Sequence, residues 1–455
     1  MNNLIIFKNN LRFNDNPVLY HGSRGSNIIP IYIYDNYNVE KDLGAASKYW
    51  LYHSLKSLNI SLDNNLQYFK GNTIDIVENL VIKNSINRVF CEQPFLEDDI
   101  KIYKNLKKKL QSLNIDLKSY NCSLLWDPNT VLKNDGTAYK VFTPYYKNGC
   151  LMRPNPDFPL GRPDKLNFLK TNNITSIDNL DLIDKFNWYK KFNSLWKISE
   201  DEALNRFKKF LDGPVYNYKK GRDFPASDSN SKLSPYIRFG LISVHRIWYE
   251  LKKMKSNIDI EHYKSEICWR EFSYYLLYHF PYIKNNNFQK KFDSFKWNNS
   301  KENFESWKKG ETGFPFIDAG MKELWQTGYM HNRVRMVVAS FLVKNLLIDW
   351  RLGEKWFWDC LLDADYASNI AGWQWAAGTG ADAAPYFRIF NPILQGQKFD
   401  KSGKYTLYYL PELKKLPLKL TQTPWETDIN CNYPKPIIDY KSSRKSALER
   451  YNEIR

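Results

Sequence analysis

The sequence predicts a two-domain protein in which an α/β domain with a parallel, Rossmann-like sheet precedes an all-helical domain. A chain of 455 residues is too long for one ordinary hydrophobic core, so we expect two. In the N-terminal part, apolar β-branched runs alternate with helical patterns, which is typical of a parallel sheet covered by helices on both faces. Strand patterns stop after Ile198, and helical periodicity dominates from there on.

The first predicted domain covers residues 1–126. Short apolar runs predict five strands, at Leu4–Phe7, Ile28–Tyr34, Leu66–Phe69, Arg88–Cys91 and Ile115–Leu125. Periodic segments between them predict three helices, at Ala45–Leu62, Thr73–Ile82 and Asp98–Leu113. No GxGxxG motif follows the first strand, so the dinucleotide fingerprint of this fold class is missing. We therefore expect any redox cofactor to bind elsewhere in the chain.

A connector at residues 127–197 leads to the helical domain at residues 198–455. The connector is rich in Pro, Asn and Asp, as in Arg153-Pro154-Asn155-Pro156-Asp157, which indicates an irregular segment on the surface. Helical patterns in the second domain lie at Asp201–Leu211, Tyr236–Lys255, His262–Phe280, Ile317–Thr327 and His331–Leu347.

The formal net charge of +17 favours a polyanionic partner, above all nucleic acid. The alternative is a solvated lysine surface, which runs such as Lys107-Lys108-Lys109 illustrate. The six cysteines include no CxxC pair, so we expect free thiols in the cytoplasm and no metal site. No apolar run reaches the length of a membrane span, and the strand pattern that begins at Leu4 leaves no room for a signal peptide.

The most informative segment runs from Trp373 to Pro392 and begins Trp373-Gln374-Trp375. On a helix, positions i and i+2 point to nearly opposite sides. One indole can then face a buried redox centre while the other faces a substrate. The alternative is core packing in a domain that is rich in aromatic residues, since the chain contains 15 tryptophans.

A second segment, from Tyr218 to Pro235, has features of a phosphate-binding loop. Ser234 followed by Pro235 predicts an N-cap with proline at the first helical position, and a helix N-terminus attracts anions. Ser231 and Lys232 would add donors to a pyrophosphate. The alternative is an ordinary helix cap without a ligand.

Two further groups of residues are candidates for a cofactor or substrate site. Asp363, Asp365 and Asn369 lie close together in sequence, either at an ordinary helix start or beside a cofactor. Glu266, Trp269 and Arg270 lie at i, i+3 and i+4, on one face of a helix. An aromatic plane beside a carboxylate suits a flipped pyrimidine base, although a salt-bridged amphipathic helix is the alternative.

Together these motifs resemble the photolyase/cryptochrome family, from residue 3 to about 440 and most strongly from Tyr218 to Phe399. The Trp-x-Trp pattern is similar to class I cyclobutane pyrimidine dimer (deoxyribodipyrimidine) photolyases. The resemblance implies light-driven DNA repair, in which reduced FAD in the helical domain gives an electron to a flipped-out dimer. It also implies a monomer that binds UV-damaged DNA, with an antenna-type N-terminal domain for a folate or deazaflavin pigment of unknown identity.

The resemblance implies a role for each matching residue. Flavin contacts fall to Tyr218, Asn230, Ser231, Lys232, Leu233, Ser234, Tyr263, Arg270, Arg335, Asp363, Asp365 and Asn369. Catalytic and dimer-contacting roles fall to Glu266, Trp269, Asn332, Met336, Asn369 and Trp375. Contacts with DNA fall to Arg222, Glu266, Trp269, Asn332, Arg333, Arg388 and Gln395. Electron transfer to the flavin falls to Trp297, Trp350 and Trp373.

Several residues bear on rival functions. Plant light sensors of this family typically carry Asp at the place of Asn369, so the amide favours repair over a cryptochrome-type photosensor. Trp375 disfavours the single-strand-specific cryptochrome-DASH group, and a single His331 disfavours repair of (6-4) photoproducts. A plain flavin oxidoreductase has no nicotinamide fingerprint to support it. Tyr263 and Tyr329 stand where relatives commonly have Trp.

Overall fold

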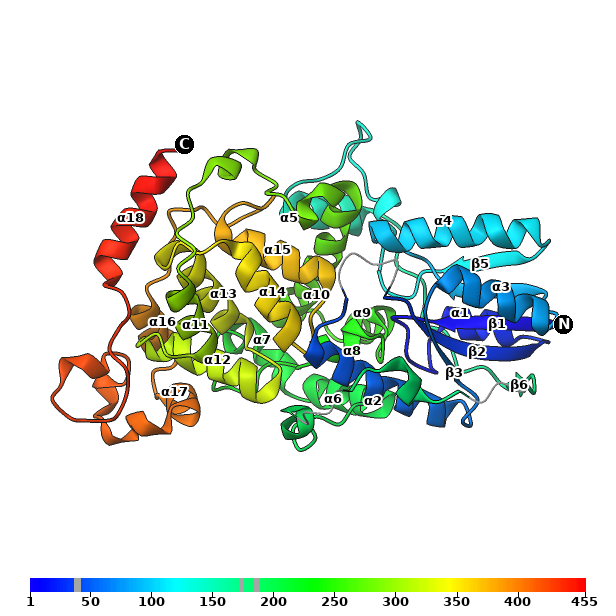
Figure 1. The fold of residues 1–455 in the computed structure, drawn as a ribbon, viewed down its shortest axis with the longest axis horizontal. Coiled ribbons are helices and arrows are strands. Elements are labelled where there is room, and N and C mark those ends of the chain that lie inside the picture. Colours follow the sequence, from blue (N-terminus) through cyan, green and yellow to red (C-terminus); the bar gives the residue numbers. More distant parts are fainter. Residues whose placement is uncertain (37–41, 172–174, 184–187) are drawn as a thin grey trace. The chain divides into compact units, whose positions relative to one another are not determined.

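The computed structural model describes residues 1–36, 42–171, 175–183 and 188–455, and it forms two compact units (Figure 1). Unit 1 comprises Met1–Tyr139, Thr143–Leu211 and Ser231–Pro281. Unit 2 comprises Lys140–Phe142, Asp212–Asn230 and Tyr282–Arg455. The units interleave along the chain, whereas the predicted domains were contiguous. The predicted domain bounds, 1–126, 127–197 and 198–455, stay a prediction.

Unit 1 contains a parallel sheet whose strands run in the order β3-β2-β1-β4-β5. Its strands are β1 (Asn2–Phe7), β2 (Asn27–Tyr34), β3 (Gln67–Lys70), β4 (Arg88–Glu92) and β5 (Asp116–Tyr120), with a short β6 (Asn167–Phe168) beside β2. All five predicted strands are confirmed. β5 ends earlier than predicted because the Asn121 side chain accepts the backbone N–H groups of Ser123 and Leu124, which turns the chain.

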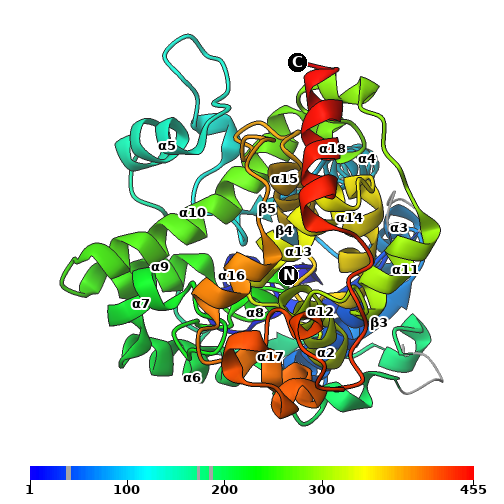
Figure 2. The same cartoon turned by 90° about the vertical axis from the view of Figure 1, so that its left-hand side faces the viewer.

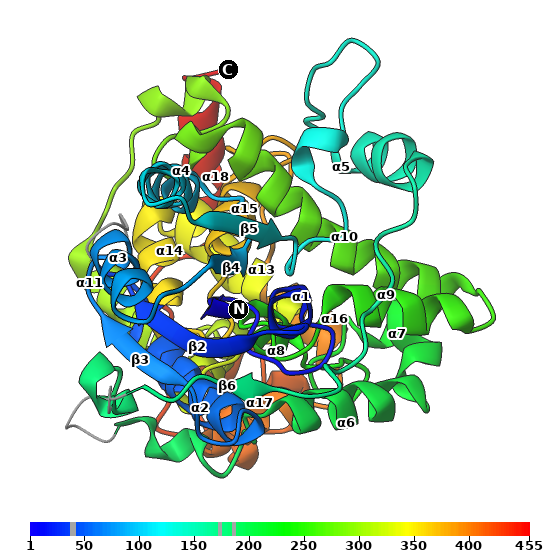
Figure 3. The same cartoon turned by 90° about the vertical axis from the view of Figure 1, so that its right-hand side faces the viewer.

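Helices cover both faces of this sheet, as the alternating pattern predicted (Figure 3). They are α1 (Pro17–Ser23), α2 (Ala45–Ser61), α3 (Thr73–Lys83) and α4 (Glu97–Ser112). Leu4 and Ile6 of β1 join a core with residues of α3 and α4. Ile5 points to the opposite face, where Gly22 of α1 packs against it. The seven-residue α1 was not predicted, because it is too short to show helical periodicity.

The later part of unit 1 contains α6 (Glu200–Leu211), α8 (Ser234–Arg238), α9 (Val244–Lys253) and α10 (Ile258–His279). The single helix predicted at Tyr236–Lys255 is wrong, since the chain breaks between α8 and α9. Gly240 has φ +69°, and a Cβ there would lie 1.9 Å from the Asn9 carbonyl oxygen. Ser243 then caps α9 by accepting the His245 N–H at 3.0 Å.

The predicted connector is mostly irregular. Its short turns of 3-10 or π-helix are η1 (Pro128–Thr130), η2 (Tyr145–Gly149), η3 (Cys150–Met152), η4 (Ile177–Leu180) and η5 (Trp188–Phe192), and α5 spans Phe142–Pro144.

Unit 2 is helical, and its described residues include no strand (Figure 2). Its α-helices are α7 (Tyr218–Gly221), α11 (Lys301–Lys309), α12 (Pro315–Thr327), α13 (Asn332–Ser340), α14 (Trp350–Cys360), α15 (Tyr366–Ala377), α16 (Pro392–Phe399), α17 (Lys404–Tyr409) and α18 (Tyr440–Asn452). Its shorter turns are η6 (Pro214–Asn217), η8 (Lys290–Ser294), η9 (Phe341–Asn345), η10 (Pro411–Lys415), η11 (Leu418–Leu420) and η12 (Pro424–Glu426), and η7 spans Pro281–Lys284. α14 and α13 both pack against α15, so three helices of unit 2 that carry predicted site residues lie together.

Candidate functional site

An ion pair joins α13 to the loop that precedes α15. Arg335 Nη2 lies 3.0 and 2.8 Å from the two carboxylate oxygens of Asp363, whose side chain is 3% exposed. Arg335 Nε also donates to the Met330 carbonyl at 2.7 Å. Burial disfavours the charged form of Arg335. The charge of Asp363 and its hydrogen bond favour that form, and the net result is a raised pKa of Arg335. Two predicted cofactor residues therefore form a charged pair that fixes this loop.

Asp365 and Asn369 shape the first turn of α15. Asp365 caps the helix, since its Oδ1 accepts the Ser368 N–H at 2.8 Å. Asn369 Nδ2 donates to the carbonyl oxygen of Glu354 at 3.0 Å and to its Oε1 at 2.7 Å. Both amide hydrogens are thus held by α14, and Oδ1 is left as a neutral acceptor. Sequence reasoning missed Glu354, although a carboxylate in a tryptophan-rich helix was a usable signal.

The two tryptophans of α15 differ in burial, as their spacing predicted. Trp373 is 3% exposed, whereas Trp375 is half-buried. The Trp373 ring lies 4.9 Å from Phe357 and 6.2 Å from Trp307, measured between centroids. Gly353 lets α14 approach this ring, since a Cβ there would lie 2.2 Å from its outer carbon.

The other predicted electron carriers have separate surroundings. Trp350 is buried at the start of α14, and its Nε1 donates to Asn287 Oδ1 at 2.9 Å. Trp297 lies beside Phe295, with 4.5 Å between ring centroids. Across the part of the chain that the structure describes, no two of these three indoles are in ring contact. The electron-transfer role of Trp297, Trp350 and Trp373 stays a prediction.

His331 acts as a neutral structural residue at the start of α13. Its Nδ1 accepts the Arg333 N–H at 3.2 Å, so the neutral ring carries its proton on Nε2. Nε2 lies 2.9 Å from the amide of Asn230, which must then present its oxygen. Burial, with nearby arginines headed by Arg222, lowers the pKa of His331 to about 3.

Predicted substrate and DNA contacts surround this helix start. Asn332 is exposed and Met336 half-buried, one turn apart on the same face of α13. Arg333 pairs with Asp223 at 2.6 Å and lies over the Phe399 ring. Arg222 lies over the ring of Tyr218 in α7, with 5.6 Å to its centroid.

In unit 1, the predicted substrate face of α10 is partly exposed. Glu266, Trp269 and Arg270 are all half-buried, while Ile267 and Cys268 between them are buried. This burial pattern fits a side-chain face that is open to a ligand. Arg270 Nη1 donates to the carbonyl oxygen of Ser123 at 2.8 Å, which fixes the guanidinium against its own unit.

The predicted phosphate loop at residues 231–234 has an unusual backbone. Lys232 has φ +50°, and Leu233 has helical dihedrals. A turn built from adjacent residues of opposite hand is the kind of backbone in which successive N–H groups can line an anion-binding nest. The predicted N-cap role of Ser234 is wrong: α8 begins at Ser234, and Leu233 holds the cap position. The Tyr263 hydroxyl donates to Ser231 Oγ at 3.0 Å.

The predicted flavin contacts thus fall into two groups, each described within its own unit. Unit 1 carries Ser231, Lys232, Leu233, Ser234, Tyr263 and Arg270. Unit 2 carries Tyr218, Asn230, Arg335, Asp363, Asp365 and Asn369.

The last predicted DNA contacts are Arg388, which lies beside a buried lysine that sequence reasoning missed, and Gln395. Arg388 is exposed, and its carbonyl oxygen accepts Lys344 Nζ at 3.1 Å. Lys344 is 1% exposed, and burial with the nearby Arg388 charge lowers its pKa to about 7. Gln395 lies on α16, and its Oε1 is buried without a hydrogen-bond partner among the described residues.

Among the described residues, no group of three or more His, Cys, Asp or Glu side chains could hold a metal ion. A search of the same residues found no helix with the length and apolar character needed to cross a bilayer.

Comparisons with known proteins cover almost the whole chain. A family described as the FAD binding domain of DNA photolyase matches residues 263–453, and one described as DNA photolyase matches residues 3–160. A deoxyribodipyrimidine photo-lyase of Agrobacterium fabrum is 39% identical, over 99% of this chain and 98% of its own.

Two solved structures are also similar to this chain. A bacterial class III photolyase from Agrobacterium tumefaciens has a TM-score of 0.95 and 38% identity, over 99% of this chain and 97% of its own. A cryptochrome from Synechocystis has a TM-score of 0.89 and 27% identity, over 99% of both chains. Their folds agree with the predicted parallel sheet followed by a helical domain.

Proposed function

The chain belongs to the photolyase/cryptochrome family, and on that premise we propose that it is a deoxyribodipyrimidine photo-lyase. It repairs cyclobutane pyrimidine dimers in UV-damaged DNA, using light and a bound FAD. When bound and fully reduced, the flavin supplies the electron that opens the cyclobutane ring of a flipped-out dimer. A damaged base pair costs less to extrude than an intact one, which contributes to selectivity.

The orientation of Asn369 carries this proposal. Glu354 holds both amide hydrogens, so Asn369 presents an uncharged oxygen. Such an acceptor suits the N5 position of a reduced flavin, which carries a hydrogen. It also places no carboxylate beside an anionic cofactor, where charge repulsion would oppose the reduced state. We propose that Asn369 contacts the isoalloxazine, and that Asp365 and the Asp363–Arg335 pair hold the cofactor around it.

The nest at residues 231–234 would bind the diphosphate. Its backbone N–H groups suit an anion, and the Ser231 hydroxyl and the Lys232 ammonium are further donors. The remaining flavin contacts are assigned to Tyr218, Asn230, Tyr263 and Arg270.

Contacts with the lesion and with DNA complete the proposal. The face of α10 that carries Glu266 and Trp269 would receive the dimer, with the Trp269 ring as a stacking surface. Asn332, Met336 and Trp375 are the other proposed dimer contacts. Basic and amide side chains would hold the phosphate backbone and position the duplex, namely Arg222, Arg333, Arg388 and Gln395.

We propose class III in place of the class I predicted from the sequence. The class I prediction depended on dimer-repair motifs, which indicate the substrate and do not separate the classes. The similarity to a class III photolyase, at a TM-score of 0.95 over nearly the whole chain, supports the change.

Other expectations stay predictions. A cryptochrome-type photosensor without repair activity is the alternative function, against which Asn369 and Trp375 argue. The six free cysteines are all buried, which supports a cytoplasmic location. The monomeric state and an antenna pigment of the folate or deazaflavin type stay predictions.

The proposal is tested by repair of two lesions in parallel. FAD-loaded protein is illuminated with oligonucleotides that carry either a thymine dimer or a (6-4) photoproduct, and restored thymines are counted. We expect restoration of the dimer alone, and only in light. A photosensor would bind FAD and restore neither lesion.

A further inference from the structure

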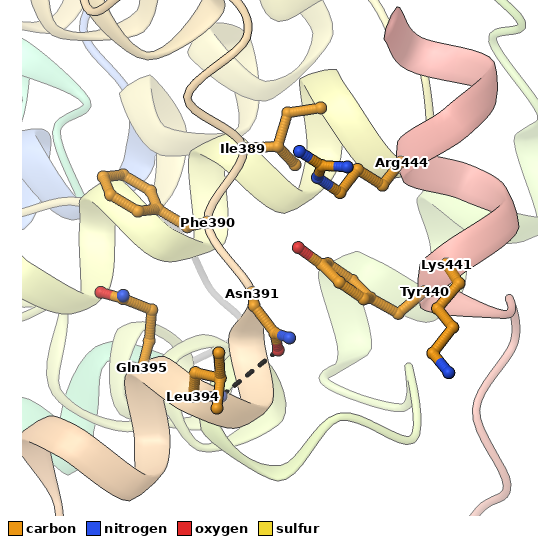
Figure 4. Close-up of a pocket in the computed structure, with 8 residues that line it drawn as sticks. All are labelled: Ile389, Phe390, Asn391, Leu394, Gln395, Tyr440, Lys441 and Arg444. Carbon is orange, nitrogen blue, oxygen red and sulfur yellow. Dashed lines mark hydrogen bonds between the residues drawn. The ribbon is translucent and has the colours of Figure 1, made fainter.

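A groove of about 510 Å³ opens on unit 2 between the segment at residues 389–395 and the first turns of α18 (Figure 4). Its lining residues are Ile389, Phe390, Asn391, Leu394, Gln395, Tyr440, Lys441 and Arg444. Two of these side chains are cationic and none is acidic. The groove therefore carries the charge of an anion site on its α18 side, where both cationic side chains are exposed.

Arg444 and Tyr440 form the donor set of this groove. They lie at i and i+4 on one face of α18, and both point toward the segment at residues 389–391, whereas the Lys441 ammonium points away from it (Figure 4). Burial raises the pKa of Tyr440, so its hydroxyl keeps its proton and can donate a hydrogen bond. Among the described residues, neither Arg444 nor Lys441 forms an ion pair with a carboxylate.

The N-terminus of α16 does not supply this site. Asn391 caps that helix, and its Oδ1 accepts the N–H groups of Ile393 at 3.0 Å and Leu394 at 3.3 Å. These two backbone donors are therefore already satisfied. An anion in the groove would depend on the side chains of α18.

α18 is held firmly against the rest of unit 2. Asn345 Nδ2 donates to Ser443 Oγ at 3.0 Å, and the Tyr451 ring stacks on Tyr386 with 4.8 Å between centroids. Ala447 is fully buried. Arg444 thus projects from a fixed helix, which lowers the entropy lost when it binds a ligand.

The groove also adjoins predicted DNA contacts. Arg388 directly precedes its first residue, and Gln395 lines it. Arg444 therefore extends the same set of polar contacts onto α18.

We propose that the groove is a phosphate subsite of the DNA interface. Arg444, with the Tyr440 hydroxyl, holds one backbone phosphate that flanks the lesion, and Lys441 adds positive charge at the rim. This inference rests on the proposed function and adds a contact outside the lesion pocket. Since a phosphate contact reads no sequence, it strengthens binding to damaged and undamaged duplex alike.

The test compares Arg444→Gln with Lys445→Gln in the full-length, FAD-loaded protein. Lys445 carries the same charge on the same helix, but it is 80% exposed, pairs with Glu449 and does not line the groove. Binding to UV-irradiated and undamaged duplexes is measured in the dark over a series of salt concentrations. For Arg444→Gln we expect the slope of log K against log salt to fall by about 0.9 on both duplexes, as for one lost phosphate contact. Lys445→Gln should retain the wild-type slope.

A dinucleotide that consists of one thymine dimer, without flanking nucleotides, distinguishes a lost phosphate contact from a folding defect. Wild type and Arg444→Gln should bind it equally, because it lacks the phosphate in question. Equal slopes for the two variants on long duplexes would overturn the proposal, as would equal losses of affinity on short and long DNA. A wild type with no preference for irradiated DNA would instead contradict the proposed function, while the undamaged duplex still tests the groove.

Discussion

Asn369 shows how one side chain can suit a site to a reduced cofactor. Its amide is neutral, and its orientation is set by two hydrogen bonds to Glu354. Asn369→Asp would place a second carboxylate against Glu354 and beside the flavin. Two carboxyl groups this close share a proton near neutral pH, so the added charge develops as the pH is raised. At alkaline pH we expect the midpoint potential of FAD to be more negative than in the wild type by about 30 mV or more, which is ~1.4 kcal/mol for a two-electron couple. An unchanged potential in a redox titration would show that Asn369 does not face the flavin.

His331 makes the stability of the protein sensitive to acid. Its folded-state pKa of about 3 lies below the ordinary value of 6.5, so the unfolded chain binds more protons between these two pH values. Stability should therefore fall as the pH drops through this range. His331→Asn keeps a cap acceptor for α13 and removes the titrating ring. We expect the loss of Tm between about pH 7 and about pH 4.5 to be smaller in this variant than in the wild type.

The sequence identified the residue types of the site better than their partners. Asp363, Asp365 and Asn369 were recognised from a local motif. Glu354 and Lys344 were missed, because each acts through a partner that is distant in sequence. Only packing of one helix on another brings such partners together.

At the scale of elements, the crossing of α14 and α15 depends on a missing Cβ. Trp373 fills the space where Gly353 would carry one, so Gly353→Ala would overpack the contact. We expect a loss of about 1–3 kcal/mol in the free energy of unfolding, measured with urea. Gly372→Ala on α15 is the matched control, since nothing lies within 4 Å of its Cβ position. That control should be neutral or more stable, because alanine favours a helix. Equal losses in the two variants would contradict the packing argument.

The Trp373 indole on α15 is also one of the three predicted electron carriers. Trp373→Phe should slow light-driven reduction of oxidised FAD by about tenfold or more, which corresponds to ~1.4 kcal/mol on the barrier. Repair by chemically reduced protein should remain close to wild type. Trp325→Phe, at an indole that is 52% exposed, is the control for loss of a tryptophan. If photoreduction and repair fell together, Trp373 would have a structural role instead.

Elements with a long, regular pattern were predictable, and those set by tertiary contacts were not. The helix at His262–Phe280 and the strand at Ile28–Tyr34 agree with α10 and β2 within a few residues. The break between α8 and α9 depends on the approach of Gly240 to Asn9, which no local pattern reveals. The two-residue β6 is too short to carry a pattern at all.

For the whole molecule, the alternating strand and helix patterns were enough to predict the fold class. The division into compact units was not predictable in the same way. Residues 231–281 are helical in pattern but cluster with the sheet-bearing unit, and the contacts that decide this are long-range. The net charge of +17 indicated a nucleic-acid partner, although charge alone says nothing about damage.

The central claim is that reduced FAD and light together repair pyrimidine dimers on this protein. The most direct measurement counts dimers in UV-irradiated oligothymidylate after incubation with protein whose flavin is either oxidised or fully reduced, each in light and in dark. We predict that dimers disappear with reduced flavin in light and persist in both dark samples. Dimers that persist with reduced flavin in light, or that disappear in the dark, would contradict it.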